Sequence, residues 1–516
     1  MDKNKTIIGK DVIESLTLGM YEDSKFIYRE YIQNAVDQID KAIDSGVLTT
    51  RLDGKVWIDI DKKHRKIIIE DNATGIKSNE TLDILRNIAQ SPKQRGIDRG
   101  FRGIGRLGGL GYCEELTFET SFKGEDSKSK MTWDAKELKN IINDRKQKEE
   151  ASYVIDSVTD FDIEPEDVDE HYFKVTLERV SNDVLLDKNK IVKYLQMVAP
   201  VQFHPKFLFN NVIYDQLKEN ELNIDEYKIY VNTDQIFKAY TTSIYDGDDK
   251  NKRKIDEIFD IKNFRIQMPN SELLGWGWYG ISTYTGMLPE INLARGLRLR
   301  KDNIQIGSAD TLVKLHKQKK NNFYFFGEIH AFHPDLIPNA RRDYFLENDY
   351  SWNFENELRT IFNSELKQLF NLASKIRSAQ NAILSFVNKK KEIDELKDKG
   401  ITNKEDRERL EKEIEQKRIR AEEGKKRLER IEAKFESEDD PVKKIYDKSV
   451  KKDLNVQKSL TFVKNKINNI PFRTDKYSKL TKRERKLISN IFQIIDEVLN
   501  KELAENLKRK IDEKFE

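Results

Sequence analysis

The sequence predicts an α+β fold whose last third is helical. Residues 11–45 carry apolar positions at helical spacing, whereas residues 56–60 and 66–69 have the alternating or apolar pattern of short strands. The connecting residues Asp61-Lys62-Lys63-His64 are polar, which is typical of a hairpin connection. Beyond residue 350 the chain is highly charged and poor in proline. We therefore expect mixed α and β layers first and helices last.

Changes in pattern divide the 516 residues into three expected domains. In residues 1–190 the hairpin is followed by a helical segment at 78–90 and by strand-like runs at 115–122 and 172–179. Residues 191–350 contain aromatic and β-branched runs such as YKIYV and GWGWYGIS, which predict a second α/β domain.

The third domain, residues 351–516, is expected to be helical. Between residues 393 and 435 apolar positions alternate by three and four, which gives a coiled-coil-like seam with polar interruptions. Gly400 followed by TNKE resembles a helix stop and a new helix start. An antiparallel helical hairpin and one long rod both fit this pattern.

Composition limits the classes of function. The formal net charge is only +2, so no overall basic field points to nucleic acid. We see no signal peptide and no apolar run long enough to span a membrane, so we expect a cytoplasmic protein without a membrane partner. The single cysteine, Cys113, excludes internal disulfides and cysteine-rich zinc sites, and we expect it to be buried.

Two segments carry polar residues where binding groups often lie. In YREYIQNAVDQIDKA, the residues Glu30, Asn34 and Asp37 stand at i, i+4 and i+7, which puts them on one helix face. Further on, an apolar β-branched run ends at Asp71, and Gly75 follows four residues later. A strand end that leads into a turn is a common place for binding groups. Taken alone, a solvated helix and a plain turn fit equally well.

A third segment, residues 100–111, has six glycines within twelve residues, in the sequence GFRGIGRLGGLG. Glycine allows close backbone approach and positive φ, so a run of N–H groups can hold a phosphate. The spacing is not the Rossmann fingerprint, and the G-K-[ST] end of a P-loop is absent. A flexible loop without a ligand is the alternative.

In this order and at these separations, the three segments resemble the GHKL ATPases. That superfamily includes gyrase, MutL proteins, histidine kinases and the ninety-kilodalton heat-shock chaperones, and the chaperones are the most similar. Their R-E-L-I-S-N-A-x-D pattern is matched here by Arg29, Glu30, Asn34, Ala35 and Asp37. Their D-x-G-x-G motif is matched at Asp71 and Gly75, but Ala73 replaces its first glycine. The resemblance implies a GHKL (Bergerat) α/β sandwich, a middle or transducer domain, and ATP with Mg²⁺ as cofactors.

The resemblance also implies roles for the matched residues. Glu30 would be the general base for the attacking water, and Asn34 would hold Mg²⁺ through its amide oxygen. Asp71 would accept a hydrogen bond from the adenine amino group, with Thr176 on a later strand supporting it. Asp37 would support the helix or an ordered water. The glycines of the nucleotide site would be Gly75, Gly100, Gly103 and Gly105.

Two basic segments lie in the expected second domain. The first, LIPNARRD, resembles the chaperones' middle-domain loop, whose arginine reaches the γ-phosphate. Aligned on Asn339, that role falls on Arg342, with Arg341 as the second choice, and it would make hydrolysis depend on domain docking. In the other, GLRLRK, the alternation puts Arg298 and Arg300 on one strand face, which we expect to be solvated.

These observations predict a chaperone-like, ATP-hydrolysing conformational machine whose lid and middle domain close on Mg-ATP. A MutL- or MORC-like DNA clamp stays open, with the strand around Arg298 as its best support, as does an ATPase subunit of a bacterial antiphage defence system. A scaffold that binds ATP without hydrolysis is a further alternative, against which the presence of Glu30 argues. The expected partners are a protein client and a second copy of the chain, joined through C-terminal helices or by ATP-dependent N-terminal closure.

Overall fold

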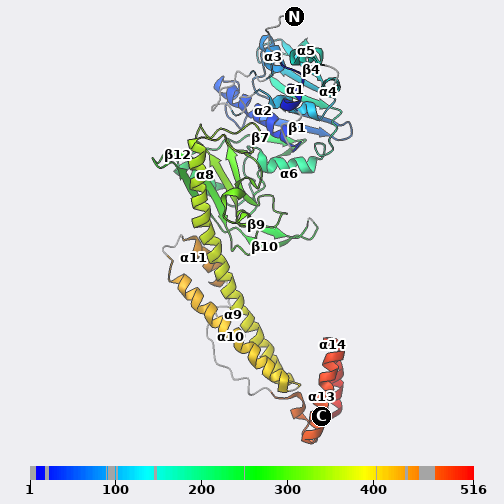
Figure 1. The fold of residues 1–516 in the computed structure, drawn as a ribbon, viewed down its shortest axis with the longest axis vertical. Coiled ribbons are helices and arrows are strands. Elements are labelled where there is room, and N and C mark those ends of the chain that lie inside the picture. Colours follow the sequence, from blue (N-terminus) through cyan, green and yellow to red (C-terminus); the bar gives the residue numbers. More distant parts are fainter. Residues whose placement is uncertain are drawn as a thin grey trace. The chain divides into compact units, whose positions relative to one another are not determined.

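The computed structural model describes residues 7–17, 23–88, 90, 99, 103–144, 148–248, 250–402, 404–435, 440–451 and 471–515. The chain divides into two units, Met1–Ser282 with Gly286–Glu365, and Thr283–Thr285 with Leu366–Glu516. The first unit contains two large sheets and the helices that pack on them, and the second is helical (Figure 1). The α+β class predicted from the sequence is confirmed.

The first sheet has eight strands among the described residues, in the order β5-β4-β3-β6-β2-β1-β7-β8. They are β1 (Lys55–Asp61), β2 (Lys66–Asp71), β3 (Glu115–Ser121), β4 (Ser127–Asp134), β5 (Thr159–Pro165), β6 (Tyr172–Glu178), β7 (Lys228–Val231) and β8 (Asp234–Gln235). β1 and β2 pair antiparallel, so the predicted hairpin is confirmed. β7 is a parallel neighbour of β1, so strands from beyond residue 190 complete the sheet.

Helices cover one face of this sheet because alternate strand residues are apolar. Ile67, Leu177 and Leu116 stand in register on β2, β6 and β3, and all three are buried in one core with Val36 and Ile39 of helix α2. The helices of this part are α1 (Asp11–Thr17), α2 (Phe26–Asp44), α3 (Ser78–Arg86), α4 (Ala135–Asn143), α5 (Ala151–Ser157) and α6 (Lys188–Val198), with the 3-10 helix η1 (Gly105–Gly111). α2 therefore has one side turned into the unit.

The second sheet has the strand order β11-β12-β15-β13-β14 in the described part of the chain. Its strands are β11 (Asp260–Gln267), β12 (Leu273–Ile281), β13 (Gly296–Lys301), β14 (Ile304–Gln305) and β15 (Phe326–Ala331), and β9 (Ser243–Asp246) pairs separately with β10 (Arg253–Glu257). Trp276 and Trp278 of β12 are fully buried in its core. The helices here are α7 (Asn210–Glu219), α8 (Asp349–Ile361), η2 (Thr311–Leu315), η3 (Lys319–Tyr324) and the π-helical η4 (Phe362–Leu366).

The expectation of a solvated face on β13 was wrong. Arg298 and Arg300 are 8% and 0% exposed, because β13 lies between β15 and β14 and its polar face is covered too. Arg300 Nε lies 2.5 Å from Glu328 Oε1, and its Nη2 donates to the Met197 carbonyl at 2.7 Å. Alternation in the sequence gives the face of a side chain but not what packs against that face. β13 therefore offers no exposed basic stripe for duplex DNA.

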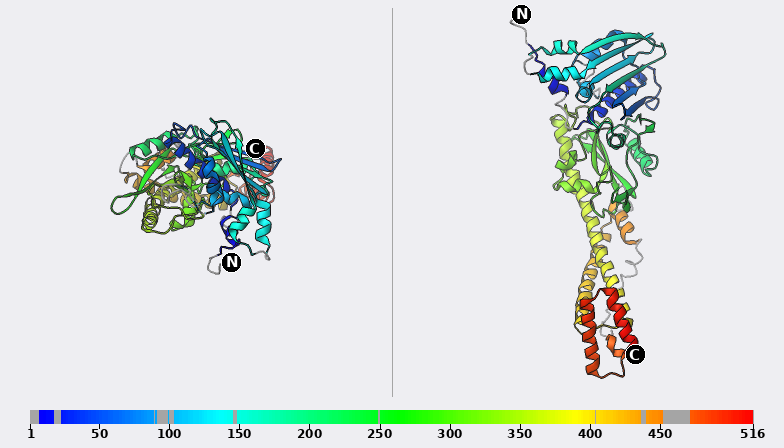
Figure 2. Two further views of the ribbon diagram at one scale, coloured as in Figure 1. Left: turned by 90° about the horizontal axis from the view of Figure 1, so that it is seen from above. Right: turned by 90° about the vertical axis from the view of Figure 1, so that its right-hand side faces the viewer.

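In the second unit, α9 (Lys367–Lys399) and α10 (Lys404–Glu432) form an antiparallel hairpin and run side by side in both sets of views (Figure 1 and Figure 2). Lys389 Nζ lies 2.7 Å from Glu413 Oε2, and Lys417 Nζ donates to Ser385 Oγ at 2.8 Å. Later positions of α9 thus meet earlier positions of α10. Gly400 ends α9 at φ +73°, the left-handed region that favours glycine. Of the two arrangements that fit the sequence, the hairpin is correct.

The rest of this unit consists of α11 (Pro441–Tyr446), the π-helical η5 (Asp447–Lys451), η7 (Arg473–Lys476), α13 (Lys482–Val498) and α14 (Lys501–Phe515). Phe492 of α13 and Ala504 of α14 are buried with Tyr477 in a small core. Within the part of the chain that the structure describes, no helix combines the length and the apolarity needed to cross a membrane.

Candidate functional site

The polar residues singled out on α2 lie on its inward side. Glu30 and Asp37 are 7% and 4% exposed, and Asn34 between them is half-buried. Arg29 Nη2 lies 3.4 Å from Glu30 Oε1. A carboxylate is buried in this way only at a cost in desolvation. α2 is therefore not the solvated helix that the spacing alone also allowed.

Asp71 ends β2 with its side chain almost fully buried, and its Oδ1 accepts a hydrogen bond from the Ala73 N–H at 3.0 Å. Burial raises the pKa of Asp71 to about 8, so the carboxyl group is mostly protonated at neutral pH. Ala73 is fully buried, so the turn accommodates its methyl group. Gly75 has φ +69°, and a Cβ there would lie 1.8 Å from the Ser121 carbonyl oxygen. Only glycine fits that position.

The described part of the glycine-rich segment packs closely on α2. A Cβ on Gly105 would lie 2.5 Å from Glu30 Oε2, so the bare backbone lets the 3-10 helix η1 touch the carboxylate. The Tyr31 hydroxyl on α2 donates to the Arg106 carbonyl at 2.9 Å. The lone cysteine, Cys113, is buried as expected. Residues 105–111 are therefore a packed element, whereas Gly100 lies outside the described residues.

All three motif segments line one cavity of about 310 Å³, a volume within the range of about 300–1,000 Å³ usual for small-molecule sites. Asn34 comes from α2, Gly75 from the turn after β2, and Gly103 from the glycine-rich segment. Phe173 supplies part of an apolar wall and is the cross-strand partner of Asp71, so these two side chains share a face of the sheet. Asp71 therefore lies beside this cavity, at the end of its strand.

Thr176 does not support Asp71, and that prediction was wrong. Thr176 pairs with Ile68 on β2 and with Thr117 on β3, whereas Asp71 pairs with Phe173. Because successive side chains on a strand point to opposite faces, Thr176 lies on the other face of the sheet from Asp71. β6 does pair with β2, but Thr176 belongs to the face of β6 that points away from Asp71.

The side chain of Arg99 is 9% exposed and lies in an ionic cluster. Its Nη1 lies 3.2 Å from Asp37 Oδ1 and 2.7 Å from Asp40 Oδ2, both on α2. Its Nη2 lies 2.5 Å from Asp225 Oδ2 and 3.1 Å from the Tyr227 hydroxyl. Asp37 therefore contributes to the position of Arg99.

Arg342 lies next to Arg99, although 243 positions separate them in the sequence. Its side chain is 5% exposed, and its Nη1 donates to the Arg99 carbonyl at 2.8 Å. Its Nε and Nη2 have no hydrogen-bond partner among the described residues. Burial lowers the pKa of Arg342 and the nearby Glu30 carboxylate opposes that shift, so the two charges interact. Arg341, the second choice for this role, is exposed.

Arg106 also lines the cavity, although it is not among the site residues predicted from the sequence. Its Nη2 donates to the Asn87 carbonyl at 2.6 Å, and its Nε lacks a partner among the described residues. Burial lowers its pKa to about 10, so it remains a cation at neutral pH. The signal in the sequence was an arginine directly after the last glycine of GFRGIG.

Residues 25–164 match the family described as "Histidine kinase-, DNA gyrase B-, and HSP90-like ATPase". These residues form a GHKL ATPase domain. Among curated proteins, the chaperone HtpG of Buchnera aphidicola is 25% identical over 143 residues, which are 24% of this chain and 23% of HtpG. HtpG of Coxiella burnetii is 32% identical over 87 residues, 16% of this chain and 14% of that protein. The chain thus matches less than a quarter of the length of these chaperones.

Among solved structures, the ATPase region of Saccharomyces cerevisiae topoisomerase II is similar with a TM-score of 0.37 and 13% sequence identity. That similarity covers 67% of this chain and 85% of the yeast chain. The assignment of the GHKL domain rests on the family match and on the relatives identified by sequence.

Proposed function

We propose that the chain is an ATP-binding and ATP-hydrolysing conformational machine, in which the glycine-rich lid and the second sheet's domain close on Mg-ATP. The observation that carries this proposal is the burial of Arg342 beside Arg99 and within electrostatic reach of Glu30. An arginine with two unpaired nitrogens can neutralise charge that develops on a transferring phosphoryl group. Because Arg342 follows the second sheet in the chain, hydrolysis would depend on the contact between the two sheets' domains.

In this proposal the 310 Å³ cavity takes the adenine nucleotide. Asp71 accepts a hydrogen bond from the adenine amino group, and the apolar wall around Phe173 packs against the ring. Gly103 and Gly105 present backbone N–H groups to the phosphates, and the Arg106 guanidinium adds a charge-assisted donor. The half-buried position of Asn34 on the cavity wall supports its role as a ligand for the metal ion.

The donor set suits Mg²⁺. No group of three or more His, Cys, Asp or Glu side chains that could hold a metal occurs in the described ranges. Mg²⁺ commonly takes only one or two protein oxygens and completes its shell with water and substrate phosphates. Asn34 would supply such an oxygen, and the bound ion would neutralise phosphate charge. Glu30, one helical turn away, would take the proton of the attacking water.

The decisive experiment compares phosphate release and ATP binding in wild type and in Glu30→Ala. We expect ATP affinity to change little and turnover to fall by about two to four orders of magnitude, the usual contribution of a general base. Glu14→Ala, on the exposed side of α1, is the matched control and should behave as wild type. If the wild type binds ATP but releases phosphate no faster than Glu30→Ala, the protein is an ATP-dependent scaffold instead.

We further propose that two copies of the chain associate through the C-terminal helices. Four apolar residues of α13 are 42–73% exposed and recur at intervals of four, three and four, which is the spacing of a helix-pairing seam. They are Leu487, Ile491, Ile494 and Val498. The same helix buries Phe492 on its other side, so this seam is additional to its packing within the unit.

A further inference from the structure

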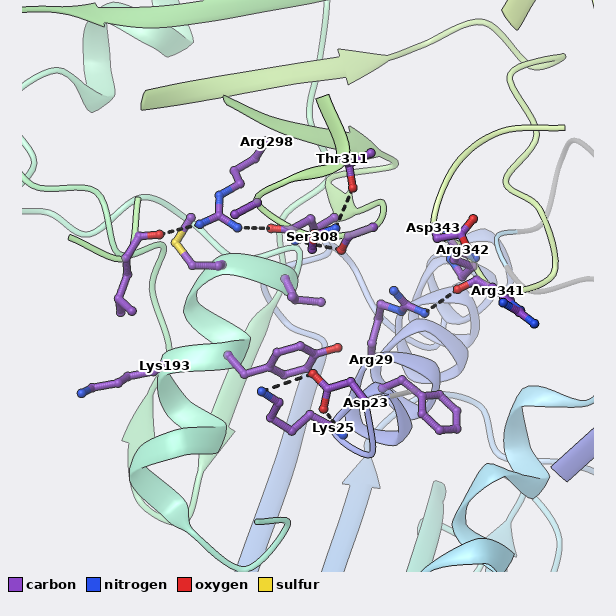
Figure 3. Close-up of a pocket in the computed structure, with 18 of the residues that line it drawn as sticks. Asp23, Lys25, Arg29, Lys193, Arg298, Ser308, Thr311, Arg341, Arg342 and Asp343 are labelled. Atoms are coloured by element: carbon purple, nitrogen blue, oxygen red, sulfur yellow. Dashed lines mark hydrogen bonds and ion pairs between the residues drawn. The ribbon is translucent and has the colours of Figure 1, made fainter. Parts of the chain in front are cut away.

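A second cavity, of about 650 Å³, has Arg29 and Arg342 in its wall (Figure 3) and shares no lining residue with the nucleotide cavity. Its walls come from the start of α2, from α6, and from the segments around β13 and residue 342. All of these elements belong to the first unit. It is therefore a separate cavity, and of the residues that line it only Arg342 also has a role in the proposed ATPase chemistry.

Positive charge dominates the lining of this second cavity. Three arginines, Arg29, Arg298 and Arg342, are each more than nine-tenths buried in its wall. The lining also includes three exposed cationic residues, Lys190, Lys193 and Arg341. A concave surface with one sign of charge concentrates the field and attracts counter-ions.

The two carboxylates of the lining do not neutralise these arginines. Asp23 Oδ2 lies 3.2 Å from Lys25 Nζ, and Asp343 Oδ1 accepts from the Asn339 side chain at 2.5 Å. Within the described residues, Arg298 and Arg342 form no ion pair with a carboxylate closer than 4 Å. Arg298 and Arg342 therefore have no carboxylate in direct contact, whereas Arg29 pairs with Glu30 at 3.4 Å and Lys190 with Asp187 at 3.7 Å.

Arg298 has an N–H group that the described residues leave unused. It is 8% exposed, its Nη1 donates to Gln305 Oε1 at 3.5 Å, and its Nη2 donates to the Leu293 carbonyl at 2.7 Å. Its Nε has no hydrogen-bond partner among the described residues, as is the case for Nε and Nη2 of Arg342. A buried guanidinium with unused N–H groups carries a desolvation cost that a bound anion would offset. Burial also lowers the pKa of Arg298, which expresses the same cost.

We propose that this cavity binds a small molecule that carries two or more phosphate groups. Guanidinium groups match phosphate geometry through paired N–H donors, and cations on several walls favour a ligand with more than one anionic group. The volume accommodates a ligand of nucleotide size. A duplex backbone is a poor fit, because the buried arginines lie inside a concavity.

The test is calorimetry of the full chain with inorganic tripolyphosphate, in the presence of a saturating non-hydrolysable ATP analogue. We expect saturable binding at one site. Arg298→Gln should weaken it at least tenfold, and so should Lys190→Gln with Lys193→Gln, a pair that is exposed and leaves the core intact. Arg295→Gln is the matched control, because Arg295 lies on the same segment but outside the cavity lining. The affinity of this variant for tripolyphosphate should equal that of wild type.

Two further arms separate this site from the nucleotide cavity and from nucleic acid. Asp71→Asn should retain tripolyphosphate binding, so a failure of the proposed ATP site leaves this result unchanged. Absence of saturable binding, or binding that is lost in Asp71→Asn and unaffected by the Arg298 and lysine variants, would overturn the proposal. Displacement of tripolyphosphate by duplex DNA at equal phosphate concentration would overturn the assignment to a small ligand.

Discussion

The protonation of Asp71 links nucleotide binding to pH. Its pKa is raised from 3.8 to about 8 by burial, so the free protein holds a proton there at neutral pH. The adenine amino group is a donor, and a donor favours the ionised carboxylate. If Asp71 binds adenine, its pKa falls on binding, and the proton leaves.

We therefore expect ATP binding at neutral pH to release a proton, and the release to disappear above the free-state pKa of about 8. Calorimetry in buffers of different ionisation enthalpy measures this release directly. Asp71→Asn should lose nucleotide binding, and unchanged ATP affinity in that variant would refute the adenine role.

The same pKa shift affects the stability of the free protein. Because the folded pKa is raised, the contribution of Asp71 is fully present below the ordinary value of 3.8 and is lost as pH rises to about 8. The melting temperature of Asp71→Asn should depend less on pH over that interval than that of wild type.

Arg342 is the residue that would make hydrolysis depend on the second sheet's domain. Arg342→Ala should slow turnover about tenfold or more while ATP affinity changes little, since a finger arginine acts mainly in the transition state. Arg341→Ala is the matched control, because Arg341 is exposed one position away. The measurement is steady-state phosphate release at saturating ATP. A loss of turnover in Arg341→Ala instead would transfer the role to Arg341.

Among the elements, η1 fixes the carboxylate of Glu30 through close contact. Gly105→Ala would place a Cβ 2.5 Å from Glu30 Oε2, too close for the two atoms to coexist, and the flexible carboxylate would move rather than the backbone. A displaced catalytic group can cost about a hundredfold in rate, so turnover should fall by that order while the melting temperature stays close to wild type. Gly286→Ala, where a Cβ meets no atom within 4 Å, is the control. Normal turnover in Gly105→Ala would mean that this contact is unimportant for Glu30.

Local periodicity predicted the elements that depend on local sequence. The β1–β2 hairpin, the helical conformation of α2 and the break between α9 and α10 at Gly400 follow from alternation, helical spacing and glycine. Features set by distant packing were not predictable in this way. The sequence does not show which face of β6 Thr176 occupies relative to Asp71, because strand register decides it.

The same reason explains the misjudged arginines. Arg298 and Arg300 have the appearance of surface charges in the sequence, and the burial of Arg300 depends on Glu328 and on the Met197 carbonyl, which lie far along the chain. The motif residues of α2, the turn after β2 and the glycine segment were predictable because spacing within each segment carries the pattern. Their meeting in one cavity was implied only by the family resemblance.

For the whole molecule, the association of two copies rests on the exposed seam of α13. Leu487, Ile491, Ile494 and Val498 leave apolar surface in water, and burial against a second copy would contribute on the order of 1.5 kcal/mol for each side chain. Lysine at Ile491 and Ile494 would place two charges in that seam. We therefore expect the wild type to sediment as a dimer and Ile491→Lys with Ile494→Lys to sediment as a monomer.

Asn490→Lys adds the same charge at an exposed polar position of α13 and should leave the dimer intact. Because Phe492 and Ile495 keep their packing within the unit, the double variant should also retain its helical content. If ATP turnover needs two copies, its rate per chain should fall with dilution in the wild type and be uniformly low in the double variant. A dimer that persists in the double variant would place the contact between copies elsewhere, with N-terminal closure on ATP as the next surface to examine.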